Sequence, residues 1–279
     1  MENSYFEVLQ WASSLLIKNG QEGHAIYYVF LKRKNWEKID WLQHMKETMP
    51  KEEKKQLETD LSKLLNDYPP QYLLGETEFY GLPFLVNEHT LIPRPETEEL
   101  IDYCLKENEA AYSTIVDVGT GTGAIAISLK HARPQWQVTG IDISKQALIV
   151  AQENAKILNT TIDFLSGDLL EPLMMNGQKV DMIISNPPYI SEAEKNWMDR
   201  SVIKYEPALA LFADQNGLAI YQRLAEEAKK VLEEDGKIYL EIGFQQGRAV
   251  QEIFQQAFPT KQIIIKKDLA ENDRIVAIT

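Results

Sequence analysis

The sequence predicts an α/β protein with a mostly parallel sheet, preceded by a small domain of helices. From about residue 113, short β-rich runs alternate with helix-like segments, an order typical of a parallel sheet covered by helices on both faces. Before about residue 68 the apolar residues recur near helical spacing, as do Phe6, Leu9 and Leu16. These two patterns predict the two-part organisation.

Residues 1–75 are expected to form a helical bundle. Its charged stretch "PKEEKKQLETDLSKLL" alternates acid and base, as on a solvated helix face. Residues 76–96 lie where prolines, glycines and short extended runs gather, so we expect a linker with a hairpin before a helix that starts near Thr97. Most aromatic residues of the bundle should fill its core, namely Trp11, Tyr27, Tyr28, Phe30, Trp36 and Trp41.

Residues 97–279 are expected to form the α/β domain, which the motifs described below identify as catalytic. Its strand candidates are "TIVDV", "QVTGID", "TIDFL", "VDMIIS", "KIYLEI", "QIIIK" and "RIVAI". The last two are joined by "KDLAEND", which is too short for a crossover helix, so they should pair antiparallel.

Composition limits the function classes. The formal net charge is −13, so the surface as a whole repels phosphate backbones and direct nucleic-acid binding is not expected. The single cysteine, Cys104, forms no internal disulfide, and the four histidines lack metal-ligand spacing, so no metal is expected. The N-terminus does not read as a signal peptide and no apolar run reaches membrane-spanning length, which predicts a cytoplasmic protein without membrane contact.

A glycine-rich loop follows the first strand candidate of the catalytic domain. In "TIVDVGTGTGAIAISLK", Gly119, Gly121 and Gly123 stand between a β-rich run and a helical pattern, the context that a nucleotide-binding loop requires. Glycines allow a tight turn and a close approach of the backbone to a ligand. The same loop also fits the dinucleotide fingerprint, so a nicotinamide-dependent dehydrogenase is a competing interpretation.

Acidic residues follow the next two strand candidates. Asp142 ends "QVTGID" and can accept hydrogen bonds from both hydroxyls of a ribose. It could instead cap the next helix, but Ser144 can serve as that cap. In "SGDLLEPL", Asp168 could bond an adenine amino group and Leu169 could cover the ring.

The strand candidate "VDMIIS" ends abruptly in "NPPY". Pro187 and Pro188 lack amide hydrogens and fix φ, so the ladder stops and the side chain and carbonyl groups around Asn186 are held in place. The Asn186 side-chain oxygen and the Pro187 carbonyl can each accept one hydrogen from an –NH2 group, while the ring of Tyr189 can lie against the planar group that carries it. The pattern predicts catalysis on a planar amino or amide nitrogen.

Several segments together resemble one known family. "DVGTGTGAIAISL", "GIDIS", "SNPPYI", "PPQYLLGETEFYGLPFLVNEHTLIPRPETEEL", "YEPALALF", "LEIGFQQG" and "NDR" are similar to the bacterial peptide chain release factor N(5)-glutamine methyltransferases, the PrmC or HemK family. The resemblance runs from about Pro69 to the C-terminus, and "LIPRPETE" is its most specific segment. It implies a Rossmann-like, seven-stranded class I methyltransferase sheet that uses S-adenosyl-L-methionine on the glutamine of the Gly-Gly-Gln motif in class 1 release factors.

The resemblance also implies roles for particular residues. Asn186, Pro187, Pro188 and Tyr189 would grip the substrate amide, with Asn186, Pro187 and Tyr189 as the catalytic group. The cofactor contacts would be Gly119, Thr120, Gly121, Thr122, Gly123, Asp142, Asp168, Leu169 and Asn186. Two positions depart from the family: Glu271 stands where a glycine is frequent, and Leu169 where relatives can carry an aromatic residue.

Three alternatives remain besides the release factor methyltransferase. An amino methyltransferase acting on adenine or cytosine in DNA or RNA would use the same "NPPY" chemistry, but it would normally need a basic groove. A dehydrogenase leaves "NPPY" without a role. A non-catalytic adaptor would not need an intact glycine loop, acid and "NPPY" segment in one chain.

Overall fold

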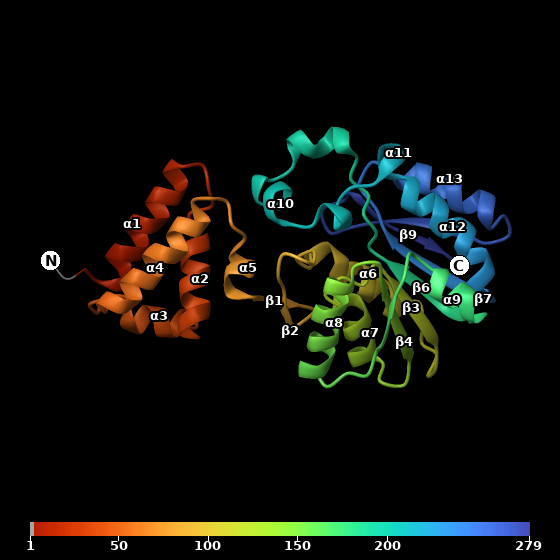
Figure 1. Ribbon diagram of the computed structural model, residues 1–279, viewed down its shortest axis with the longest axis horizontal. Coiled ribbons are helices and arrows are strands. Elements are labelled where there is room, and N and C mark those ends of the chain that lie inside the picture. Colours follow the sequence, from red (N-terminus) through yellow and green to blue (C-terminus); the bar gives the residue numbers. More distant parts are fainter. Residues whose placement is uncertain (1–2) are drawn as a thin grey trace. The chain divides into compact units, whose positions relative to one another are not determined.

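The computed structural model describes residues 3–279 and divides the chain into two compact units (Figure 1). One unit contains the chain up to Glu76 together with Asp199–Tyr205. The other contains Thr77–Met198 and Glu206–Thr279. No helix among residues 3–279 is both long and apolar enough to cross a membrane.

The first unit is entirely helical. Its helices are α1 (Tyr5–Lys18), α2 (Ala25–Lys34), α3 (Lys38–His44), α4 (Lys51–Leu64), α5 (Pro70–Leu74) and α10 (Arg200–Tyr205). A capping box between Ser4 and Glu7 starts α1, and Asn19 caps its end. The helix α5 begins at Pro70, because a proline at the first helical position favours a helix start.

The core of the helical unit is rich in aromatic residues, as the sequence predicts. Phe30 is buried, and it packs edge-on against Trp36 with ring centroids 5.8 Å apart. Trp11 is the exception among the six aromatic residues, since 49% of it is exposed. The helix α10, which comes from the middle of the chain, joins this unit through Tyr205, whose hydroxyl donates to the Asn66 carbonyl.

The second unit is built on a seven-stranded sheet of order β5-β4-β3-β6-β7-β9-β8. The strands of the chain are β1 (Glu76–Phe79), β2 (Leu82–Leu85), β3 (Thr114–Val118), β4 (Gln137–Asp142), β5 (Asp163–Ser166), β6 (Val180–Ser185), β7 (Leu232–Glu241), β8 (Ile263–Lys267) and β9 (Asp273–Ile278). Strands β3 to β7 pair parallel, whereas β9 pairs antiparallel with β7 and with β8. The antiparallel pairing of the last two strands is therefore confirmed.

Helices cover both faces of this sheet (Figure 1). The helices and 3-10 turns are α6 (Pro95–Lys106), α7 (Ala124–Ala132), α8 (Lys145–Ile157), α9 (Glu171–Asn176), η1 (Glu192–Trp197), η2 (Ala208–Ala210), α11 (Asp214–Gly217), α12 (Ala219–Val231) and α13 (Gly247–Ala257). The helices α9, α12 and α13 pack on one face, and α6, α7 and α8 pack on the other.

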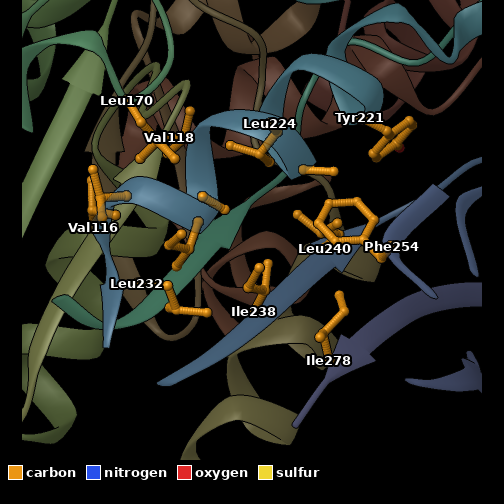
Figure 2. Packing of buried hydrophobic residues seen from close by; sticks show 14 of the residues in the cluster. Val116, Val118, Leu170, Tyr221, Leu224, Leu232, Ile238, Leu240, Phe254 and Ile278 are labelled. Atoms are coloured by element: carbon orange, nitrogen blue, oxygen red, sulfur yellow. The ribbon is translucent and has the colours of Figure 1, made fainter. Parts of the chain in front are cut away.

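Alternate residues of each central strand enter different cores, as the period of a strand requires. In β7, Ile238 and Leu240 pack with α12 and α13 (Figure 2). Tyr239 packs instead with α6 on the other face. Phe79 and Phe84 of the β1–β2 hairpin belong to the same cluster as Tyr239. The hairpin, expected to lie in a linker, is thus part of the core of the second unit.

Candidate functional site

A cavity of about 240 Å³ opens at the carboxyl ends of the parallel strands, where open α/β sheets bind ligands. It is lined by four predicted groups, the glycine loop, the end of β4, the pair Asp168 and Leu169, and the "NPPY" segment, together with segments that the sequence did not single out. The lining residues are His89, Thr90, Leu91, Val118, Gly119, Gly121, Ile141, Asp142, Ile143, Ser144, Ala147, Gly167, Asp168, Leu169, Ser185, Asn186, Pro187, Pro188, Pro207, Leu209, Ala210, Ile220 and Arg223.

The three glycines of the loop do different work. Gly119 and Gly121 line the cavity with φ values of 73° and 56°, a left-handed backbone that favours glycine. A Cβ on Gly119 would meet no protein atom within 4 Å, so the backbone there is open to a ligand. Gly123 is not a lining residue. A Cβ on it would come within 2.9 Å of Ile127 and 3.3 Å of Ala151, so this glycine lets α7 and α8 pack closely.

The two threonines of the loop lie below the cavity surface. The Thr120 hydroxyl donates to the Asp117 carboxylate at 2.6 Å, and the Thr122 carbonyl accepts a hydrogen bond from Asn154 at 2.9 Å. Burial raises the pKa of Asp117 to about 7, although the Thr120 bond opposes this shift. The structure thus gives Thr120, Thr122 and Gly123 a role in holding the loop, while Gly119 and Gly121 lie where a cofactor would touch the chain.

Asp142 ends β4 and faces the cavity. Its carboxylate accepts from the backbone amides of Gly121 and Ser144, each at 2.8 Å, which fixes its orientation. Burial raises the pKa of the Asp142 carboxyl, and the amide hydrogen bonds favour its ionised form. Ser144 is the residue that caps α8, because its hydroxyl accepts from the Ala147 amide at 3.2 Å. The Asp142 carboxylate therefore keeps acceptor capacity for a ribose.

Asp168 and Leu169 line the cavity beyond β5. The Asp168 carboxylate is 2.8 Å from the Arg223 guanidinium, a partner from α12 that the sequence did not reveal. Leu169 has a φ of 48°, a left-handed conformation that is costly for a branched side chain. Together with Ile143, it gives the cavity an apolar wall suited to a planar ring.

The "NPPY" segment directly follows the carboxyl end of β6. Asn186, Pro187 and Pro188 line the cavity, and Pro187 is buried. Within residues 3–279, no group donates a hydrogen bond to the Asn186 side-chain oxygen or to the Pro187 carbonyl. Both acceptors are thus available to a substrate amide. Tyr189 differs: it is not a lining residue, and its hydroxyl donates to Glu241 at 3.4 Å.

Backbone contacts hold the segment after the prolines. Ile190 pairs with the chain at Leu211 and Ala213 through bonds of 2.9 Å each, and the Gln246 side chain donates to the Tyr189 carbonyl at 2.9 Å. The Tyr189 carbonyl also lies where a Cβ on Gly217 would be, so only glycine fits there. These contacts make the "NPPY" segment a rigid platform.

The segments that carried the family resemblance meet around this platform. Glu206 of "YEPALALF" is buried, and its carboxylate binds the Arg94 guanidinium of "LIPRPETE" at 2.5 Å and the Ile92 amide at 3.0 Å. Further back, Thr97 and Glu241 connect to Asn186 by hydrogen bonds. Pairs more than one hundred residues apart leave no periodic signal in one sequence. The resemblance to the family was the only available signal for these segments.

The cavity residues fit S-adenosylmethionine. The open backbone at Gly119 and Gly121, the fixed Asp142 carboxylate and the apolar wall supply the contacts that an amino acid moiety, a ribose and an adenine require. Asn186 and Pro187 lie on the same cavity, so a nitrogen nucleophile held there would share the space with the cofactor.

Comparison with known proteins decides the family. A model of the methyltransferase small domain matches residues 97–206, and a model of the PrmC N-terminal domain matches residues 7–75. The release factor glutamine methyltransferase of Enterococcus faecalis is 60% identical to the chain over 275 residues, which cover 99% of each protein. The chain belongs to the release factor glutamine methyltransferase family.

Other members and solved structures agree with this placement. The release factor glutamine methyltransferase of Bacillus subtilis is 38% identical to the chain over 276 residues, which cover 97% of this chain and 96% of the Bacillus subtilis protein. A crystal structure of a methyltransferase from Pyrococcus furiosus matches the fold with a TM-score of 0.54 and 16% identity, over 79% of this chain and 97% of the other. The Rossmann-like methyltransferase fold is thus confirmed.

Proposed function

We propose that this chain transfers a methyl group from S-adenosylmethionine to the side-chain amide nitrogen of the glutamine in the Gly-Gly-Gln motif of class 1 release factors. The observation that carries the proposal is the pair of open acceptors, the Asn186 side-chain oxygen and the Pro187 carbonyl, on a cavity that fits the cofactor. Membership of the family supports the same substrate.

The two acceptors suit an amide better than a stronger nucleophile. The lone pair of an amide nitrogen is delocalised, so the nitrogen is a poor nucleophile unless its geometry is constrained. Accepting both –NH2 hydrogens at Asn186 and Pro187 holds the nitrogen with its lone pair directed away from them, and places negative partial charge beside a nitrogen that becomes positive. No general base is required before attack.

The cofactor supplies an electrophilic methyl group on a sulfonium sulfur when it is bound. Asp142 would hold the ribose, the backbone at Gly119 and Gly121 would approach the amino acid moiety, and Leu169 would contact the adenine. Once it carries the transferred methyl group, the amide nitrogen would be positively charged and strongly acidic, so it would release one proton to water. The rigid "NPPY" platform keeps the nitrogen in position throughout.

We also propose that the helical unit docks the body of the release factor. A glutamine between glycines offers little surface, so contacts remote from the glutamine must supply much of the discrimination against other glutamines. The helical unit has a hydrophobic core of its own, and the proposed cofactor-binding and catalytic residues all lie in the second unit. The acidic balance of the chain argues against direct nucleic-acid binding.

Labelling in a cell lysate tests the substrate class. The purified protein is incubated with S-adenosylmethionine carrying a labelled methyl group and a lysate of bacteria that lack the endogenous enzyme. The proposal predicts label on release factors, removed by protease and not by nuclease. Label that nuclease removes would instead support an adenine or cytosine methyltransferase.

A further inference from the structure

A chain of buried hydrogen bonds runs from Asn186 away from the cavity. The Asn186 side-chain nitrogen donates to the Thr97 hydroxyl at 3.1 Å, and the Thr97 hydroxyl donates to the Glu241 carboxylate at 2.6 Å. Asn186 follows β6, Thr97 is in the first turn of α6, and Glu241 ends β7. Thr97 is 4% exposed and Glu241 is 1% exposed, so water does not compete for these bonds.

The hydrogens that Thr97 and Glu241 can donate determine the orientation of the Asn186 side-chain amide. A threonine hydroxyl has one hydrogen, and an ionised carboxylate has none. The Thr97 hydrogen must therefore be donated to Glu241, so the Thr97 oxygen can only accept from Asn186. The –NH2 group of Asn186 is the only part of its side chain that can donate. It must face Thr97, and the side-chain oxygen must face the other way.

We propose that Glu241, acting through Thr97, is a positioning residue that fixes the orientation of the Asn186 side chain so that its oxygen, and not its –NH2 group, meets the substrate amide. The inference rests on the proposed function and specifies how the site is kept ready for it. A reversed Asn186 would oppose a donor to a donor and would repel the substrate. Orientation of this side chain therefore decides whether the platform binds an amide at all.

The groups around Glu241 determine the pH at which its carboxyl ionises. Facing it are the Tyr189 hydroxyl from the "NPPY" segment, the Tyr221 hydroxyl of α12, which donates to the Glu241 carbonyl, Arg274 of β9 and Glu96 of α6. Burial raises the pKa of Glu241 to about 7, although the hydrogen bond from Thr97 and the positive charge of Arg274 both lower it.

Protonation of Glu241 reverses the direction of the hydrogen-bond chain. A protonated carboxyl can donate to the Thr97 oxygen, which frees the Thr97 hydrogen to point at Asn186 and favours the reversed amide. Because the productive orientation needs the ionised carboxylate, turnover should fall as the pH falls through about 7. A purely structural role for Glu241 predicts loss of folding or cofactor binding, and no such change in turnover of the folded enzyme.

Two substitutions at Thr97 separate these possibilities. Thr97→Val keeps the shape and removes the hydroxyl, whereas Thr97→Ser keeps the hydroxyl. The matched control is Thr114→Val, because the Thr114 hydroxyl also donates to a carboxylate, that of Asp181 at 2.8 Å. Thr114 begins β3, at the end of the strand away from the cavity. For each variant, cofactor affinity is measured by calorimetry, and kcat is measured on intact release factor across about pH 6 to about pH 8.5 at saturating substrates.

The proposal predicts that Thr97→Val keeps cofactor affinity within about twofold but loses about 10- to 100-fold in kcat at high pH. Thr97→Ser should recover most of that loss, and Thr114→Val should behave as the wild type. The wild-type kcat should decline below about pH 7, and the decline should disappear in Thr97→Val.

The inference is overturned if Thr97→Val and Thr97→Ser have the same kcat, or if the wild-type kcat is constant over that pH range. Should Thr97→Val fail to fold, Glu241→Gln takes its place, and a kcat that still declines below about pH 7 in that variant would contradict the relay. Failure of the proposed function looks different, since the wild type itself would then leave the release factor unmethylated at every pH.

Discussion

Removing the Asp142 carboxylate is the most direct perturbation of the cofactor site. In the structure this carboxylate is held by the amides of Gly121 and Ser144, and it retains acceptor capacity toward the cavity. In Asp142→Ala, two ribose hydroxyls lose a charged partner, and hydrogen bonds to charged groups contribute about 1.5–3 kcal/mol each. Water enters the space left by the carboxylate, so we use the lower value and expect a loss of about 3 kcal/mol, roughly 100-fold in Kd.

The assay is titration calorimetry with S-adenosylmethionine at about pH 8, on the alkaline side because burial raises the pKa of Asp142. Asp163→Ala is the matched control, because Asp163 is an exposed aspartate that begins β5 and does not line the cavity. Its Kd should stay within about twofold of the wild type. An Asp142→Ala protein that folds and binds the cofactor with wild-type affinity would refute the ribose assignment.

Three further predictions concern Asn186, the buried Glu241 and the helical unit. Asn186→Ala should retain cofactor affinity and lose roughly 100-fold or more in kcat, since one of two acceptors for the substrate amide is gone; steady-state kinetics with calorimetry check this, and a wild-type rate would contradict it. Raising the pH from about 5 to about 8 should lower the free energy of unfolding of the wild type by roughly 2 to 3 kcal/mol more than that of Glu241→Gln, because the native carboxyl keeps its proton up to a pKa of about 7 while the unfolded one releases it near 4.5. Equal pH slopes in urea melts would contradict the raised pKa. A chain that lacks residues 1–68 should bind the cofactor normally, methylate intact release factor at least about tenfold more slowly, and match the full chain on a short Gly-Gly-Gln peptide; equal rates on the intact factor would exclude docking by the helical unit.

Local pattern was enough to predict the frame of the catalytic unit. The runs "TIVDV", "QVTGID" and "VDMIIS" are strands with the bounds of β3, β4 and β6, because buried strands leave near-continuous apolar runs in the sequence. The glycine loop, Asp142 and the "NPPY" segment could be placed on one edge of the sheet for the same reason, since each directly follows such a run.

The rest of the site depends on pairings between distant segments. Arg223 reaches Asp168 from α12, and Thr97 joins Glu241 across 144 positions of the sequence, so neither pair leaves a local pattern. Thr97 illustrates the difficulty: a threonine in the first turn of a helix normally bonds its own backbone, yet this hydroxyl bonds a carboxylate on another element. Glu271 shows a backbone effect, since its φ of 64° explains why a glycine suits that turn.

The identity of the methylated atom tests the central claim most directly. A class 1 release factor from cells that lack this modification is incubated with the enzyme and S-adenosylmethionine, and its peptides are sequenced by mass spectrometry. The account predicts one added methyl group, on the side-chain amide of the Gly-Gly-Gln glutamine, in the wild type and none above background in Asn186→Ala. A methyl group on any other residue, or an unmodified glutamine with a cofactor-binding wild-type enzyme, would contradict it.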